Sequence, residues 1–172
     1  MNKHNFAPTI LRAYDIRGIY QDTLTEADAH AIGRAFIATL RQRGHGVTVA
    51  VGRDGRLSSP ALAAALIDGL VQAGGEVRDI GCGPTPMLYF AGVTWQCDGA
   101  IQVTGSHNPP THNGFKMVMN GKSFFGDDIQ QLGQISAAGV ANGDGGSVTE
   151  TAIFDDYVNR LLQQADAGDL SI

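Results

Sequence analysis

Residues 104–116 hold the side chains of this sequence best suited to chemistry, in the order TGSHNPPTHNGFK. Ser106 offers a hydroxyl, His107 an imidazole beside it, and Lys116 an ammonium group at the far end of the stretch. Gly105 permits a sharp turn next to the serine, and two prolines restrict the backbone beyond it. A serine hydroxyl needs a base before it reacts, and a closed loop could return Lys116 to it. A rigid loop of this kind suits a nucleophile or a phosphoryl carrier.

Other interpretations start from the same residue types. An ordinary polar loop, in which Ser106 caps a turn and Lys116 is solvated, has the same composition and stays open as an alternative. A serine hydrolase would carry a G-x-S-x-G motif, and the residues around Ser106 do not match it. A zinc site at His107 and His112 lacks a third ligand. Residues 81–84 (GCGP) lack the further glycine of a dinucleotide-binding turn.

Two further clusters carry charged side chains. In residues 12–18 (RAYDIRG), Arg17 lies beside Gly18, and its planar guanidinium could make two charge-assisted bonds to a phosphate. A short strand and turn with arginines is more often structural. Residues 52–58 (GRDGRLS) fall between a strand end and a helix start. For Asp54 we predict a structural role, in which its carboxylate pairs with an arginine or accepts hydrogen bonds from backbone amides.

Helix and strand patterns alternate along the chain and must position these clusters. Thr25 with Asp28 forms a weak capping box, and Ser59 followed by Pro60 marks another helix start. The Asn120-Gly121 pair between two β patterns is a strong hairpin signal. The expected strands are residues 47–51, 76–80, 100–103, 115–119 and 122–125, and the expected helices are about residues 26–43, 59–73, 86–94, 127–138 and 154–164.

This succession predicts an α/β fold: a mixed, mostly parallel sheet with helices on both faces. Right-handed crossovers would bring the loops after residues 51, 80 and 103 to one rim of the sheet, where open α/β sheets bind ligands. Residues 139–147 (GVANGDGGS) read as a glycine-rich linker. We therefore predict one domain over residues 1–145, and in residues 146–172 a linker and the start of a helix that leads to another domain.

Composition excludes several classes of function. The chain has 172 residues, 43% hydrophobic and 17% charged, which is enough apolar surface for a folded core. Twelve Lys and Arg against seventeen Asp and Glu give a net charge of −5, so nucleic acid is not an expected partner. No apolar segment resembles a signal peptide or approaches the roughly 18 residues of a membrane span. We expect a cytoplasmic protein without a membrane partner, and reduced thiols at Cys82 and Cys97.

The motif TGSHNPPTHNGFKM resembles the phosphoserine loop of the α-D-phosphohexomutases, in particular the bacterial phosphomannomutase/phosphoglucomutase branch. Three other segments, AYDIRG, VGRDGRLSSP and GPTPMLYFA, are similar to first-domain motifs of that family and occur in the same order. The resemblance covers about residues 10–125. Relatives with phosphoglucosamine mutase activity usually carry ASHNP in the loop, so TGSHNPP favours the glucose/mannose branch.

The resemblance implies a role for each matched residue. Ser106 would be the phosphorylated serine that donates its phosphoryl group to a sugar phosphate and recovers one from the bisphosphorylated intermediate after that sugar reorients. His107 and Lys116 would line the reacting phosphoryl group, with Lys116 assisting proton transfer at Ser106. Arg17 and Tyr14 would belong to a substrate-facing loop, where they and His107 would bind the substrate. Arg17 would also be catalytic, because with Lys116 and the metal it would neutralise the charge of the transferring group. A phosphoserine oxygen would be one ligand of Mg²⁺, and glucose 1,6-bisphosphate would be the activator.

The sequence also departs from the family pattern. The remaining magnesium ligands of the family come from a D-x-D-x-D triplet in a second domain, and this sequence contains no such triplet. The chain therefore resembles the first domain, and we expect the remaining domains of the same protein to be its partners and hexose phosphates to be the substrates. Alone it should be inactive as an intramolecular phosphotransferase. The alternative is a stand-alone phosphosugar-binding module without turnover.

Overall fold

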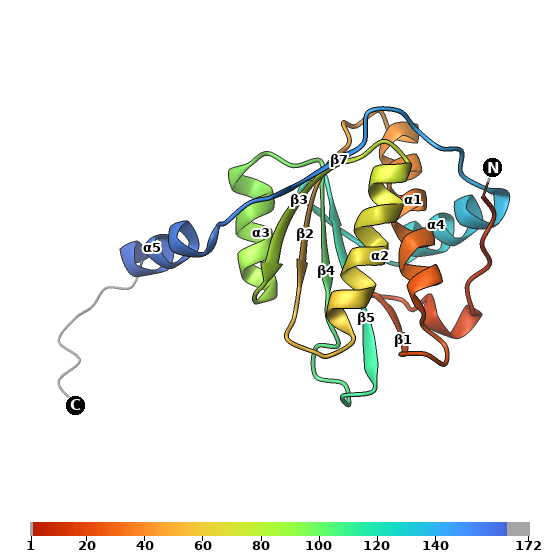
Figure 1. Ribbon diagram of the computed structural model, residues 1–172, viewed down its shortest axis with the longest axis horizontal. Coiled ribbons are helices and arrows are strands. Elements are labelled where there is room, and N and C mark those ends of the chain that lie inside the picture. Colours follow the sequence, from red (N-terminus) through yellow and green to blue (C-terminus); the bar gives the residue numbers. More distant parts are fainter. Residues whose placement is uncertain (1, 165–172) are drawn as a thin grey trace.

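A mixed sheet organises the molecule (Figure 1), and the computed structural model describes residues 2–164. Within these residues the strand order is β1-β5-β4-β2-β3-β7, and β6 pairs with β5. The strands are β1 (Ile16–Ile19), β2 (Thr48–Arg53), β3 (Glu76–Cys82), β4 (Gly99–Val103), β5 (His112–Met119), β6 (Lys122–Phe124) and β7 (Ser147–Glu150). The helices are η1 (Pro8–Ile10, a 3-10 turn), α1 (Glu26–Gln42), α2 (Ser59–Gln72), α3 (Thr85–Thr94), α4 (Asp127–Ala138) and α5 (Phe154–Gln164).

Parallel pairing joins four strands of this sheet, β4, β2, β3 and β7. Antiparallel pairing adds β5 next to β4, with β1 and β6 alongside β5. The turn between β5 and β6 holds Asn120 at φ 47° and Gly121 at φ 72°, the left-handed pair that a tight hairpin turn requires. The predicted α/β class with a mixed, mostly parallel sheet is confirmed, and so is the hairpin.

Helices cover both faces of the sheet, as predicted. Val49, Val51 and Ile101 pack into the larger core with residues of α1, α2 and α4. The alternate residues Ala50 and Ala100 face the other way and contact Leu88 of α3. A strand side chain alternates between faces at every residue, so β2 and β4 need apolar residues at successive positions to bury both faces.

Three features of the sheet were not predicted. Strand β7 lies in the segment assigned to a linker and helix start, and it pairs with β3 from Glu76↔Ser147 to Asp79↔Glu150. All four of its residues are exposed. The strand therefore has no buried face that an alternation of apolar and polar residues in the sequence could have indicated. A short strand was expected in residues 12–18, but not its pairing with β5, which extends over the whole of β1. That pairing draws the polar residues His112 and Asn113 into β5, which begins three residues before the predicted start at residue 115.

The carboxyl ends of β2, β3 and β4 meet at one rim of the sheet. Asp54, just after β2, donates its backbone N–H to Val103 O, and Gly83, just after β3, donates to Arg53 O, each at 2.9 Å. The three loops expected at a common rim are therefore neighbours. None of the helices within residues 2–164 is long and apolar enough to cross a membrane.

Helices α1 and α2 touch through their backbones at two glycines. A Cβ atom on Gly33 would lie 2.4 Å from Leu66 O, and one on Gly69 would lie 2.1 Å from His30 O. Both distances are shorter than any ordinary contact of a Cβ atom. The close approach of the two helices therefore depends on the missing side chains.

Gly69→Ala should lower the free energy of unfolding by about 2 kcal/mol or more, because the added methyl group forces the two helices apart. The matched control is Gly92→Ala in α3, where the Cβ would meet only Ala100 Cβ at 3.5 Å. There the better helix propensity of alanine should leave stability unchanged or raise it. Urea unfolding of both variants measures the difference, and equal stabilities would contradict the backbone contact.

Candidate functional site

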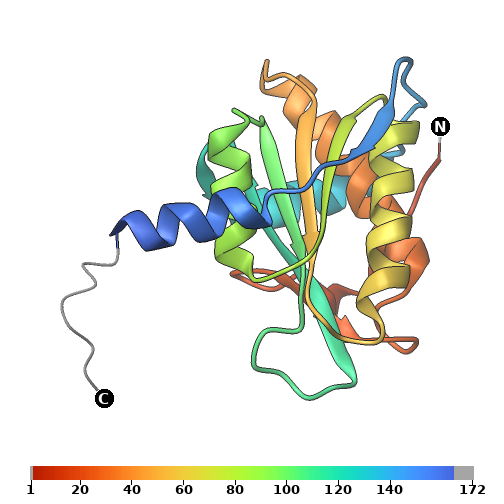
Figure 2. The same cartoon turned by 60° about the vertical axis from the view of Figure 1, so that its left-hand side comes forward.

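The loop between β4 and β5 extends beyond the rim of the sheet (Figure 2) and presents Ser106. Ser106 is exposed and its φ is 52°, in the left-handed region that favours glycine. Its backbone N–H donates to Thr104 Oγ1 at 2.9 Å, and its Oγ lies 3.1 Å from His107 Nδ1. A non-glycine residue is held in this region only when its surroundings impose it, and such strain concentrates at functional sites.

Arg56 imposes that conformation from the neighbouring β2–α2 loop. One guanidinium nitrogen, Nη1, donates to Pro109 O at 2.6 Å and His112 O at 3.0 Å. The other, Nη2, donates to Asn108 O at 2.7 Å and Ser106 O at 3.1 Å. A single side chain thus ties four carbonyl groups, three in the loop and one at the first residue of β5, a set we call the Arg56 clamp. Sequence reasoning missed Arg56, although its motif was placed at the same rim.

Asp54 holds the clamp in place. Its Oδ2 lies 3.3 Å from Arg56 Nε and accepts a hydrogen bond from the Gly105 N–H at 2.9 Å. Its Oδ1 accepts hydrogen bonds from Ser59 Oγ at 2.5 Å and from the Arg56 N–H at 3.1 Å. Burial raises the pKa of Asp54, but hydrogen bonds from Ser59, Arg56, Gly105 and Thr104 outweigh it and lower the pKa below its ordinary value. The predicted structural role of Asp54 is confirmed.

Gly105 is needed for a different reason from the expected one. The positive φ falls on Ser106, and Gly105 has no such conformation. A Cβ atom on Gly105 would instead lie 2.0 Å from Arg56 Cζ. The glycine therefore makes room for the guanidinium rather than for the turn itself.

Lys116 lies inside β5, not at the end of a loop. It is half-buried and pairs with Gln102 of β4, on the face of the sheet that also carries α3. There it lines a hollow of about 390 Å³ with Tyr14, Tyr89 and Phe125. Among residues 2–164 its ammonium group makes no hydrogen bond to Ser106, so the structure does not bring these two predicted partners into direct contact.

Arg17 is a buried residue of β1 rather than part of a loop. It is 2% exposed and lies opposite Gly114 in the β1–β5 pairing. Its Nη2 pairs with the Asp15 carboxylate, and its Nη1 has no hydrogen-bond partner within the described chain. A buried guanidinium nitrogen without a partner is costly unless another group reaches it.

Tyr14 is 83% exposed and stacks on Phe125 with ring centroids 6.5 Å apart. Its ring lines the same hollow as Lys116. The structure thus gathers Tyr14 and Lys116 at one hollow, with Ser106 and His107 on the loop beyond the rim.

The described residues do not form a magnesium site by themselves. No group of three or more His, Cys, Asp or Glu side chains in residues 2–164 could hold a metal ion. Both carboxylate oxygens of Asp54, which lies beside the loop, already accept hydrogen bonds. Mg²⁺ requires a near-octahedral set of oxygen ligands. Ser106, through a phosphoryl oxygen, would supply at most one of them.

Arg56→Lys should lower the free energy of unfolding by about 2 kcal/mol, because an ammonium group cannot reproduce the planar fork that bonds several carbonyls. Amide exchange of residues 105–112 should accelerate at least about tenfold, since the loop opens locally. Hydrogen exchange followed by mass spectrometry reports both effects. Arg53→Lys is the control, because Arg53 makes no side-chain hydrogen bond among the described residues. Equal exchange in the two variants would contradict the Arg56 clamp.

The contribution of Asp54 to stability should disappear in acid. Its pKa is lower in the folded chain than the ordinary value of about 3.9, so its contribution is complete above that value. The contribution is lost as the pH falls through the lower, folded-state pKa. Asp54→Asn should therefore be less stable than the unmodified chain at pH 6, and the gap should narrow below about pH 3.9. Urea unfolding between about pH 6 and pH 3 measures the difference in stability between the two proteins. A difference that does not change with pH would contradict the lowered pKa of Asp54.

Comparison with known proteins identifies the family. Residues 8–141 match the family model described as phosphoglucomutase/phosphomannomutase, alpha/beta/alpha domain I. The chain is 46% identical over 160 residues to a phosphomannomutase/phosphoglucomutase of Pseudomonas aeruginosa, covering 90% of this chain and 34% of that protein. It is 44% identical over 161 residues to a phosphoglucomutase of Neisseria meningitidis, covering 92% of this chain and 35% of that protein.

A solved structure shows the same fold. The crystal structure of a phosphoglucomutase/phosphomannomutase family protein from Burkholderia thailandensis matches with a TM-score of 0.84 and 44% identity, over 92% of this chain and 36% of that one. The chain thus spans about a third of the length of the curated relatives that it matches. With the match to domain I over residues 8–141, these similarities show that the chain belongs to the phosphoglucomutase/phosphomannomutase family.

Proposed function

We propose that this chain carries the phosphorylated serine of an isomerase that interconverts hexose 1-phosphate and hexose 6-phosphate. The observation that carries the proposal is the exposed Ser106 on a loop held by the Arg56 clamp, with three carbonyl groups in the loop and a fourth at the first residue of β5. Phosphoryl transfer asks a protein mainly for positioning and charge neutralisation, so a strained, clamped serine suits it. The names of the relatives support glucose and mannose phosphates as the substrate class.

The proposed reaction transfers one phosphoryl group in each direction. A free sugar hydroxyl attacks the phosphorus on Ser106, the bond from phosphorus to Ser106 Oγ breaks, and the serine oxygen takes up a proton in place of the one lost by the sugar hydroxyl. The resulting bisphosphorylated sugar reorients, and Ser106 then attacks its other phosphoryl group in the reverse step. The product is the isomeric monophosphate, and the serine is phosphorylated again.

Four side chains have distinct roles in this proposal. His107 Nδ1, at 3.1 Å from Ser106 Oγ, is placed to handle the serine proton. Lys116 would assist that proton transfer and neutralise the transferring group once it lies over the hollow. The unpartnered Nη1 of Arg17 suits a phosphate oxygen of the substrate, and the exposed ring of Tyr14 suits a sugar face.

The remaining domains are required in this proposal. Mg²⁺ would be held by the phosphoryl oxygen on Ser106 and by carboxylates from outside this chain, and when bound it would neutralise phosphoryl charge. The first domain would extend past residue 145 to include β7, which pairs with β3, and the residues after β7 would lead to the second domain. The chain alone would therefore show no turnover, and glucose 1,6-bisphosphate would restore the phosphoserine in the complete enzyme.

A fusion protein tests the proposal. In this fusion protein the chain replaces the matched third of the Pseudomonas aeruginosa relative. The fusion protein should convert glucose 1-phosphate to glucose 6-phosphate and carry one phosphoryl group on Ser106. Lys116→Met should lower kcat roughly 100-fold or more, as expected for a lost acid–base group. Coupled assay and peptide mapping by mass spectrometry are the measurements.

The matched control is Lys122→Met, an exposed lysine in β6 outside the hollow, which should leave kcat unchanged. Ser106→Ala should remove both the phosphoryl group and the turnover. Phosphate on another residue, or normal turnover in Lys116→Met, would contradict the assigned roles. A folded fusion protein that binds hexose phosphate without turnover would favour the alternative of a binding module.

A further inference from the structure

Arg34 on α1 is a buried cation without a carboxylate partner. It is 3% exposed. Its Nη2 donates to Val140 O at 2.7 Å and to Asn142 Oδ1 at 3.0 Å, and its Nη1 donates to Gln72 Oε1 at 3.3 Å. All these acceptors are neutral, and no carboxylate of residues 2–164 forms an ion pair with Arg34. Its Nε has no hydrogen-bond partner in the same residues. A buried charge in this position is costly unless an anion reaches it.

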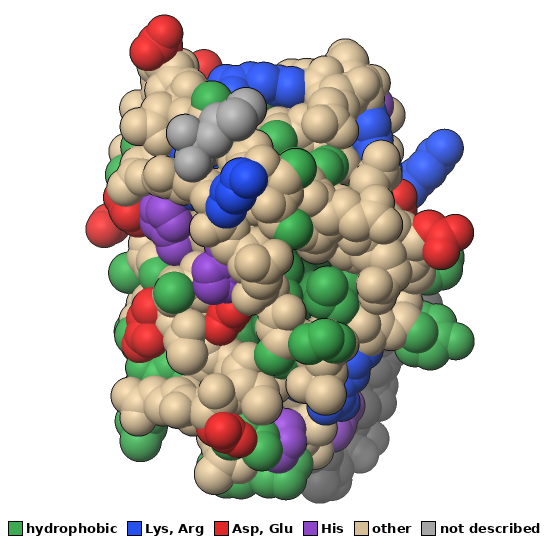
Figure 3. Space-filling view, turned by 90° about the vertical axis from the view of Figure 1, so that its right-hand side faces the viewer, with side chains coloured by type: hydrophobic (Ala, Val, Ile, Leu, Met, Phe, Trp, Pro, Cys, Tyr) green, Lys and Arg blue, Asp and Glu red, His purple; other side chains and the backbone are tan. Residues whose placement is uncertain are grey.

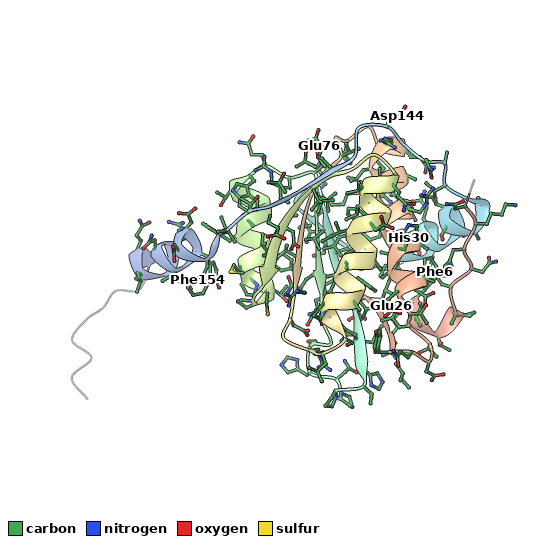
Figure 4. The ribbon with its side chains drawn as sticks, viewed as in Figure 1. Phe6, Glu26, His30, Glu76, Asp144 and Phe154 are labelled. Atoms are coloured by element: carbon green, nitrogen blue, oxygen red, sulfur yellow. The ribbon has the colours of Figure 1, made fainter. Side chains whose placement is uncertain are left out.

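A small hollow adjoins this guanidinium. It has a volume of about 200 Å³ and is lined by Arg34 together with Lys3, His4, His30 and Ser136. Figure 4 shows His30 and Phe6 on the side of the molecule that carries α1 and α4. On the corresponding face in Figure 3, histidine side chains and Lys or Arg side chains gather, with acidic side chains around them. The hollow is smaller than the roughly 300 Å³ at which pockets for drug-sized ligands begin, so it suits a small ion or one end of a larger molecule.

Two carboxylates pair with histidines that line the hollow. Asp28 Oδ1 lies 2.8 Å from His4 Nε2, and its Oδ2 accepts a hydrogen bond from the Thr25 N–H at 2.8 Å. Asp68 Oδ2 lies 3.4 Å from His30 Nε2. Each carboxylate thus fixes the orientation of one imidazole ring. The second ring nitrogen, Nδ1, of both histidines has no hydrogen-bond partner among the described residues.

We propose that this hollow binds a small oxyanion of the phosphate class, either inorganic phosphate or the phosphate group of a metabolite. The guanidinium of Arg34 and the ammonium group of Lys3 supply positive charge at the hollow, and Lys3 Nζ can donate to a phosphate oxygen. The anion would provide the counter-charge that the buried guanidinium lacks. The site shares no residue with the Ser106 loop or with the hollow at Lys116, so it does not depend on the proposed mutase function.

The test is a titration of the 172-residue chain with inorganic phosphate at constant ionic strength, followed through the arginine Nε–H signals in ¹⁵N NMR. The Arg34 Nε–H signal should shift saturably with phosphate and should not shift with chloride. The Arg17 Nε–H signal reports separately on the site near Ser106, so a response there alone would overturn the proposal. A parallel titration with glucose 6-phosphate distinguishes the two sources of the anion. Equal or tighter binding assigns the site to a metabolite phosphate, and weaker binding assigns it to inorganic phosphate.

Arg34 is buried, so Arg34→Lys risks unfolding the core. Residues at the surface of the hollow can be changed with less risk to the fold. The double variant Lys3→Gln, His30→Gln changes two partly or fully exposed residues and should raise the Kd for phosphate about tenfold or more. The matched control is the double variant Lys122→Gln, His45→Gln, which removes the same residue types outside the hollow and should leave the Kd unchanged. An Arg34 signal that never saturates, or an equal Kd in both double variants, would overturn the proposal.

Discussion

The guanidinium of Arg56 is the interaction on which the presentation of Ser106 depends. The loop between β4 and β5 contains two prolines, which have no backbone N–H to pair with its carbonyl groups. From a different loop, Arg56 supplies donors for three of those carbonyls and for the carbonyl of the first residue of β5, and the Asp54 carboxylate holds the guanidinium through Nε. Because both loops leave adjacent parallel strands, the order of β2 and β4 in the sheet is what makes the contact possible. The topology of the sheet and the exposure of one hydroxyl group are therefore linked through a single side chain.

The two faces of the sheet have different tasks. On one face, α1, α2 and α4 bury the larger core, and the glycine contacts between α1 and α2 leave it tightly packed. The other face is covered by α3 over only part of its width, and the uncovered part carries Lys116 and Tyr14 at the hollow. A strand such as β5 serves both faces, since Phe115, Met117 and Met119 enter the core while Lys116 points to the opposite side. Alternate residues of β5 thus pack in the core and, at Lys116, line the hollow on the other face.

Much of this architecture could be predicted from the sequence, because its signals are local. The capping residues Thr25 and Asp28, the proline after Ser59 and the Asn120-Gly121 turn each act within a few residues, and the elements they mark are present. The prediction failed where long-range pairing decides the structure. Strand β7 has no apolar residue that is buried, and β1 takes its length from β5. The Arg56 clamp was missed for the same reason, since it joins residues about fifty positions apart and only Gly105 records it locally.

Strand β7 also determines where helix α5 lies relative to the sheet. Its ladder with β3 fixes the segment immediately before α5, and Ile153 packs against Met87 and Ala91 of α3. Phe90 and Tyr157 add a ring contact between α3 and α5 with centroids 5.8 Å apart. The start of α5 is therefore anchored at two places, the β3 edge of the sheet and the surface of α3. The direction in which α5 leaves the sheet is set by these contacts rather than by a flexible linker.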